Sequence, residues 1–260
     1  MNLGFLGIAG KEAKTRYVPI DGWIPQRGEW NYVSADAPSY VINIPDRDAI
    51  LINPGTRLRI YQGGTVEYFL VTVVGTSAAG ISAVTIYGGT DYSLTASGLQ
   101  NCSFSPIKAP YGFPLSDAKW TVTTSDTSNA AQASPTASTW YNLGSISITI
   151  PIGVWNVYYQ VINELTVTEV AIVSLAMRAT LSTANNTESD NTNTSSQGAT
   201  VPIVTGGILR FNQVITAKVF TLTSKTQYYL NSFWGATGAT SLNFRGDLAP
   251  TVIKAVSVYL

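Results

Sequence analysis

Residues 57–74, RLRIYQGGTVEYFLVTVV, decide the expected fold of this chain. Two runs rich in β-branched and aromatic residues, 57–61 and 65–74, lie on either side of Gln62-Gly63-Gly64. Such residues suit the pleated surface of a strand. Glycine can take the positive φ that a tight turn requires. The stretch therefore predicts a β-hairpin.

The same pattern continues along the chain. In 145–150, SISITI, isoleucines alternate with hydroxyl residues, as in a strand with one buried face. Thr168 to Leu181 is the best helix candidate, because its apolar residues are loosely spaced by three and four, but its valines and threonines favour a strand. Further strands are expected at 84–87, 154–162, 167–178, 209–223, 227–233 and 252–260. The sequence thus predicts an all-β protein.

Composition limits the functions that the chain can have. Of 260 residues, 45% are hydrophobic and only 12% are charged, and fifteen basic residues balance fifteen acidic ones. This balance gives no basic footprint for nucleic acid, so no nucleic-acid partner is expected. No run is long and apolar enough for a spanning helix, so no membrane insertion is expected. Residues 1–17 do not resemble a secretory signal, so release of an assembled particle by lysis is the expected route to a cell surface.

The absence of histidine removes several kinds of catalytic and metal site. Ser-His-Asp and Cys-His nucleophiles need an imidazole to move the proton, and many zinc sites need one as a ligand. Cys102, the single cysteine, is interpreted as a small buried residue rather than a reactive thiol. No catalytic residue, metal site or cofactor is expected, and the chain is interpreted as non-enzymatic.

Three short motifs have a chemical interpretation beside a structural one. Glu164 and Glu169 could converge as the carboxylate pair of a glycoside hydrolase, but surface charges are the preferred interpretation. Asp46-Arg47-Asp48 could hold a divalent cation, but two carboxylates are few and a solvated turn is preferred. Arg245-Gly246-Asp247 matches an integrin-binding tripeptide, but its glycine serves a turn equally well.

Two changes in composition suggest how the chain is divided. Residues 105–117 are proline-rich and predict a semi-rigid linker between a β domain at 1–104 and a β-sandwich at 118–260. The second domain, with some eight strands, fits a jelly roll. Ser182 to Thr200 has no large apolar side chain, so an exposed, mobile loop is expected there.

The first domain resembles a family of tail-associated structural proteins of siphovirus-type phages and prophages. The motifs that carry this resemblance are Asp21-Gly22-Trp23-Ile24-Pro25, Trp30, Tyr32-Val33-Ser34-Ala35, Pro54 to Arg59, Gln62 to Phe69, Gly88 to Leu94 and Tyr111-Gly112-Phe113-Pro114. The resemblance implies a domain that anchors the chain to other structural proteins of the virion. Trp23, Trp30 and Tyr32 are the candidate anchoring residues.

The second domain is similar in architecture to the trimeric sandwiches that end phage fibres and that occur in the tumour-necrosis-factor and C1q-like group. The cues are Trp155 to Tyr159, Thr226 to Leu230 and Ile253 to Val258. This similarity implies a homotrimer. The expected function is that of a structural virion protein, a fibre, spike or decoration subunit at the tail, collar or head. The alternative is a receptor-binding protein that recognises host-surface saccharide through Trp140, Trp155, Tyr159 and Trp234.

Overall fold

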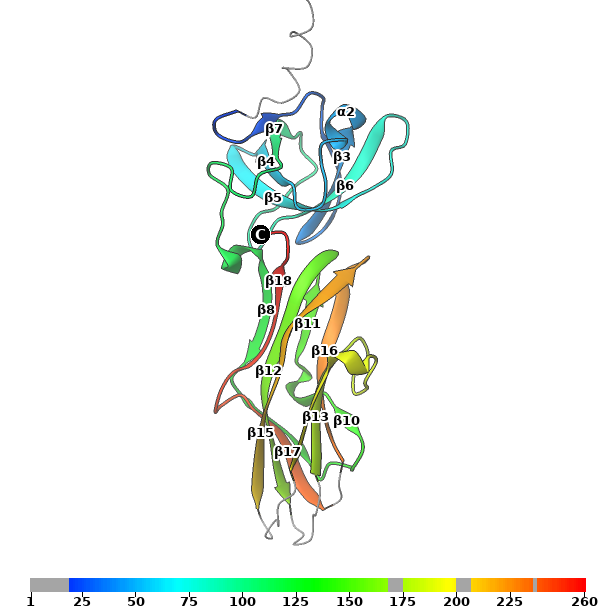
Figure 1. The fold of residues 1–260 in the computed structure, drawn as a ribbon, viewed down its shortest axis with the longest axis vertical. Coiled ribbons are helices and arrows are strands. Elements are labelled where there is room, and N and C mark those ends of the chain that lie inside the picture. The colour runs from blue at the N-terminus through cyan, green and yellow to red at the C-terminus, as the bar shows by residue number, and fades with distance from the viewer. Residues whose placement is uncertain (1–18, 168–174, 200–206, 236–237) are drawn as a thin grey trace, which may run out of the picture. The chain divides into compact units, whose positions relative to one another are not determined.

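A computed structural model describes residues 19–167, 175–199, 207–235 and 238–260. The predicted all-β class is confirmed, because strands paired in antiparallel sheets make up most of these residues (Figure 1). The chain divides into two compact units. The first ends at Lys119 and also contains Tyr259 and Leu260, and the second runs from Trp120 to Val258.

The first unit is built on one seven-stranded antiparallel sheet with the order β1-β7-β4-β5-β6-β3-β2. The hairpin predicted at 57–74 is confirmed, and its two turn glycines, Gly63 and Gly64, both have positive φ. The elements of this unit are β1 (Ile24–Pro25), β2 (Asn31–Asp36), β3 (Ser39–Pro45), α2 (Asp46–Ala49), β4 (Arg57–Gln62), β5 (Thr65–Val74), β6 (Ile81–Tyr87), β7 (Gln100–Ser105) and the 3-10 turn η2 (Asp117–Trp120), at whose end the second unit begins.

One face of this sheet forms the core of the first unit. Leu58 and Ile60 of β4 point into it together with Phe69 of β5. Trp30, next to β2, stacks on Phe104 of β7 at a centroid distance of 6.4 Å. Because β2 and β7 lie towards opposite ends of the strand order, this contact requires the sheet to curl around its core.

Cys102 also belongs to this core, as predicted. Burial raises the pKa of its thiol to about 12, so the thiolate that would react is strongly disfavoured.

The proline-rich segment at 105–117 differs from the expected linker. Ser105 still belongs to β7 and is fully buried, and Phe113 is buried as well. The backbone N–H of Tyr111 donates to the carbonyl of Asp21 at 2.9 Å, and the indole N–H of Trp23 donates to the carbonyl of Tyr111 at 2.7 Å. The segment therefore packs as part of the first unit, and the second unit begins only at Trp120.

The second unit is a sandwich of two antiparallel sheets. One has the order β8-β18-β12-β17-β9, with β15 also paired to β12, and the other has the order β10-β16-β13-β14, with β11 also paired to β16. The elements are β8 (Thr121–Asp126), β9 (Asn129–Ala133), β10 (Trp140–Tyr141), η3 (Leu143–Ser145), β11 (Ser147–Ile150), β12 (Gly153–Val167), β13 (Leu175–Ser182), η4 (Asn191–Asn193), β14 (Thr194–Ala199), β15 (Ile208–Leu222), β16 (Thr226–Trp234), β17 (Ala239–Arg245) and β18 (Thr251–Ser257). The strand preferred for 168–181 is confirmed where described, from Leu175 onward; residues 168–174 lie outside the described residues.

Strand β12 is central to the first of these sheets. It pairs with β15 along one edge, and with β18 and then β17 along the other. Buried polar side chains of β12 also reach the opposite sheet. The Tyr159 hydroxyl donates to the carbonyl of Ala179 at 2.5 Å, and the Ser232 hydroxyl donates to Oδ1 of Asn163 at 2.8 Å. These bonds fix how the two sheets face each other.

The prediction of a mobile loop at 182–200 is wrong for both of its ends. Ser182 is the buried end of β13, and Thr194–Ala199 forms β14, which pairs with β13. Between them, the Asn231 amide donates to the carbonyls of Ala184 and Thr187. The segment carries few apolar side chains, but its backbone completes a sheet. Thr200 itself lies outside the described residues.

Among the described residues, no helix combines the length and apolar character needed to cross a membrane.

Candidate functional site

The residues predicted to anchor the chain are mostly internal. Trp23 and Trp30 are each only 1% exposed, and Tyr32 packs against the core of the first unit. The expectation that these two tryptophans dock on a partner is therefore corrected. They stabilise the unit as core residues, because the Trp23 ring packs against Tyr68 and the Trp30 ring packs against Phe104.

The residues predicted to bind saccharide are also mostly buried. Trp155, Tyr159 and Trp234 lie in the core of the sandwich, so no sugar ring can stack on them. Trp140 alone keeps a partly exposed ring, which lies against Phe233 at a centroid distance of 5.0 Å. The predicted four-residue platform is therefore not present on this unit.

The first unit instead carries a groove over the outer face of the β4–β5 hairpin, with a volume of about 300 Å³. We call it the tyrosine groove. It is lined by Arg59, Tyr61, Val66, Tyr68, Asn101, Tyr111 and Gly112. The alternation in 57–61 contained a signal for it: Leu58 and Ile60 point into the core, so Arg59 and Tyr61 must point outward.

The floor of the tyrosine groove is held in place by Arg59. Its guanidinium lies 4.9 Å from the centre of the Trp23 ring and donates from Nε to the Ser103 hydroxyl at 3.1 Å. The Asp21 carboxylate lies 3.6 Å from Nη1. Cation–π contact and hydrogen bonding together restrain a side chain that is otherwise flexible.

One wall of the groove is the backbone at Tyr111 and Gly112. Gly112 has a φ of +84°, and a Cβ there would lie 2.8 Å from the Tyr68 hydroxyl oxygen, so the position requires glycine. Tyr111 is 81% exposed although its backbone is hydrogen-bonded to Asp21 and Trp23. A fixed backbone therefore presents a largely free aromatic ring.

A second exposed surface lies where α2 meets β6. Ile50 is 80% exposed, Leu51 41% and Ile81 43%. We call these three residues the apolar corner. Ile81 pairs with Pro45, the residue before α2, and a hollow of about 280 Å³ beside them is lined by Asp46, Ala49, Ile50, Ser77 and Ser82.

Asp48 of α2 lies next to the apolar corner in the chain, and its carboxylate is fully buried. It accepts hydrogen bonds from Nε and the backbone N–H of Arg27, both at 2.9 Å, and from the indole N–H of Trp30 at 3.1 Å. Burial alone would raise the pKa of Asp48, but the hydrogen bonds from Arg27, Trp30 and Gly28 outweigh it and hold the pKa below its ordinary value.

The two carboxylates of Asp46-Arg47-Asp48 point to different partners. Asp46 accepts from the hydroxyls of Ser77 at 2.5 Å and Ser82 at 3.1 Å, whereas Asp48 faces the 27–30 segment. They do not converge as ligands of one cation. The preferred interpretation as a solvated turn is wrong for Asp48, because its carboxylate is a buried structural group.

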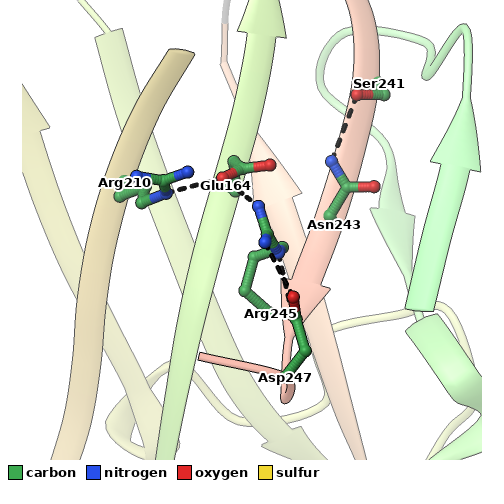
Figure 2. A network of polar contacts seen from close by, with 6 residues as sticks. All are labelled: Glu164, Arg210, Ser241, Asn243, Arg245 and Asp247. Carbon is green, nitrogen blue, oxygen red and sulfur yellow. Dashed lines mark hydrogen bonds and ion pairs between the residues drawn. The ribbon is translucent and has the colours of Figure 1, made fainter. Parts of the chain in front are cut away.

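Glu164 of β12 is clamped by arginines from both neighbouring strands (Figure 2). Arg210 Nε donates to it at 2.6 Å and Arg245 Nη1 at 2.5 Å. Burial opposes ionisation of Glu164, but the hydrogen bonds from Arg245 and Arg210 hold its pKa below the ordinary value. A general acid needs a raised pKa, so Glu164 is unsuited to that role. Glu169 lies outside the described residues.

The same network closes the Arg245-Gly246-Asp247 tripeptide on itself. Arg245 forms two parallel bonds to Asp247, at 2.8 and 2.7 Å, while its third nitrogen holds Glu164 (Figure 2). An adhesive tripeptide would need this guanidinium free for a partner. The turn interpretation is the one that the geometry fits.

Comparison with known proteins gives distant structural likenesses. No protein-family model matches the sequence, and no curated protein does. Dimeric latent PorU from Porphyromonas gingivalis aligns at 10% identity and a TM-score of 0.30, over 90% of this chain and 25% of its own. A chain of the T13 particle of infectious bursal disease virus aligns at 13% identity and a TM-score of 0.27, over 91% of this chain and 74% of its own. The VP2 subviral particle of that virus aligns at 16% identity and a TM-score of 0.25, over 88% of this chain and 62% of its own. At these TM-scores the alignments carry no argument about function.

The buried carboxylate gives a prediction about stability and pH. The pKa of Asp48 is lower in the folded chain than in the unfolded one. The ionised carboxylate therefore contributes its full stabilisation of the fold at pH values above the unfolded pKa of about 3.9. That contribution is lost as pH falls through the lowered folded value. We expect Asp48→Asn to destabilise the first unit by about 2–4 kcal/mol at pH 7, and the difference from the unchanged protein to shrink below about pH 4.

Urea unfolding at pH 7 and at pH 3 measures this difference. Glu29→Gln is the matched control, because Glu29 is an exposed carboxylate in the 27–30 segment that contacts Asp48. An equal loss of stability at both pH values would contradict the assigned role of the ionised carboxylate.

Proposed function

We propose that the chain is a non-enzymatic structural protein of a tailed-phage virion and that it attaches to the particle through the apolar corner of its first unit. The resemblance of the 21–114 motifs to tail-associated proteins supports this, as does the low charge content of the chain. The observation that carries the proposal is the exposure of three large aliphatic side chains, Ile50, Leu51 and Ile81, where α2 meets β6.

The chemistry of the apolar corner suits a lasting protein contact. Exposed aliphatic side chains gain free energy on burial, at roughly 25 cal/mol per Å² of apolar surface. A docking surface loses less conformational entropy when it is already rigid, and α2 is tied down by the bonds of Asp48 to Arg27 and Trp30. The proposed occupant is an apolar surface on another structural protein of the same particle.

The rival function, saccharide recognition through the sandwich, rests on Trp140 alone among its four candidate residues. Trp140 contacts Phe233, and the Arg178 guanidinium lies 5.3 Å from the centre of the Phe233 ring. This small cluster is the remaining observation in favour of that function.

The attachment proposal is tested with particles produced without this protein. We expect the full chain to bind to them and to sediment with them. Ile50→Asp and Ile81→Asp should each reduce the bound fraction at least ten-fold, because a buried unpaired carboxylate costs several kcal/mol.

Leu248→Asp is the control for the added charge, because Leu248 is an exposed apolar residue of the second unit. Thermal melting of each variant checks that folding is unchanged. Full binding by both apolar-corner variants, or equal loss with Leu248→Asp, would overturn the proposed attachment surface.

We further propose that the chain is a homotrimer, assembled through its second unit. Strand β15 supports this: among the described strands it forms a β-ladder with β12 alone, and it exposes Ile208, Val214 and Val219. A long edge strand with exposed aliphatic residues is normally covered. Light scattering of the full chain at micromolar concentration should give three times the chain mass of 27.8 kDa. A monomer mass would contradict the trimer.

A further inference from the structure

The tyrosine groove has no role in the proposed attachment, and its residues suit a different ligand. Its rings come from three separate segments: Tyr61 from β4, Tyr68 from β5 and Tyr111 from the 105–117 segment. The core of the first unit does not require the Tyr111 ring, which is the most exposed of the three. Three phenol rings around one hollow, with an arginine and an asparagine among them, constitute an assembled polar and aromatic site.

The electrostatics of the groove favour a ligand without net charge. The guanidinium of Arg59 has the Asp21 carboxylate beside it, so its charge is largely balanced. Its Nε donor is taken by Ser103 and its Nη1 faces Asp21. Within the described part of the chain Nη2 has no hydrogen-bond partner, so its donors remain for neutral acceptors such as hydroxyl oxygens.

The sheet geometry argues against a peptide ligand that adds as a strand. Such a peptide needs a free strand edge. The strand beneath the groove, β4, is paired with β5 on one side and β7 on the other, so neither of its edges is free. A ligand in this groove must therefore bind to side chains. The groups available to it are the tyrosine rings and their hydroxyls, the Arg59 guanidinium and the Asn101 amide.

Aromatic ring faces with hydrogen-bonding groups at their edges are chemically complementary to a pyranose sugar. The C–H bonds on one side of a sugar ring pack on an aromatic face, while its hydroxyls accept and donate at the rim. The volume of about 300 Å³ lies at the lower end of the range for ligand sites, which suits one or two sugar rings. Because the backbone at Tyr111 and Gly112 is already fixed, it loses little conformational entropy on binding.

We propose that the tyrosine groove binds a neutral saccharide of one or two pyranose rings. Tyr111 and Tyr61 provide the stacking faces, and Arg59 and Asn101 hydrogen-bond to the hydroxyls. The site lies on the first unit and is independent of the apolar corner. It therefore goes beyond the proposed attachment and does not depend on it.

The test uses the full chain and defined sugars. Neutral disaccharides of glucose, galactose and N-acetylglucosamine, and a matching set that contains uronic or sialic acid, are titrated at millimolar concentration and followed by the chemical shifts of the protein. We expect at least one neutral disaccharide to bind. Tyr111→Ala and Tyr61→Ala should each weaken that binding at least ten-fold.

Two control variants separate this site from the others. Trp140→Ala removes the exposed ring of the sandwich and should leave saccharide binding unchanged, and so should Ile50→Asp in the apolar corner. Thermal melting excludes loss of folding, and for any tyrosine variant that melts early the Tyr→Phe change at the same position keeps the stacking face and should retain most of the binding.

Three results would overturn the proposal. They are the absence of binding by every sugar, a preference for the acidic set, and loss of binding with Trp140→Ala but not with Tyr111→Ala. Failure of particle attachment with intact sugar binding would count only against the apolar corner, and the reverse result only against the tyrosine groove.

Discussion

Strand β12 carries the interactions on which the sandwich of the second unit depends. Its fifteen residues give hydrogen bonds to β15 on one edge and to β18 and β17 on the other, so three strands take their register from it. Its buried side chains also reach the opposite sheet, where the Tyr159 hydroxyl donates to Ala179 and accepts from the Ser195 N–H, and where Asn163 accepts from Ser232. Buried polar groups left without partners cost free energy, so these bonds disfavour any other alignment of the two sheets.

The strands were predictable because local patterns determine them, whereas the positions of the aromatic side chains depend on tertiary structure. The hairpin at 57–74 follows from Gly63-Gly64 and the apolar runs beside it. In β12, Trp155 and Tyr159 lie on the same face as Val157, which marks them as core residues, but residue type alone suggested a sugar platform. The 182–200 segment was mispredicted because its side chains are small and polar, while its contribution is the backbone pairing of β14 with β13.

The first unit offers two surfaces of different chemistry on one rigid framework. The apolar corner consists of aliphatic side chains supported by the buried Asp48 carboxylate, and its exposure is not evident from the sequence, because it depends on where the short helix α2 ends. The tyrosine groove consists of aromatic rings and hydrogen-bonding groups supported by Trp23 and Arg59. The tryptophans singled out from the sequence thus support the two proposed binding surfaces indirectly, because they contact Arg59 and Asp48, which hold the exposed residues in place.

We propose that this chain is a virion component attached by its first unit. An electron-microscopy map of the particle that carries it would show that attachment. We expect density for the chain in which Ile50, Leu51 and Ile81 are covered by a neighbouring structural protein, while the sandwich is in contact with two further copies of itself. Particles that contain no copy of the chain, or a map in which the sandwich alone contacts the particle and the apolar corner faces solvent, would contradict it.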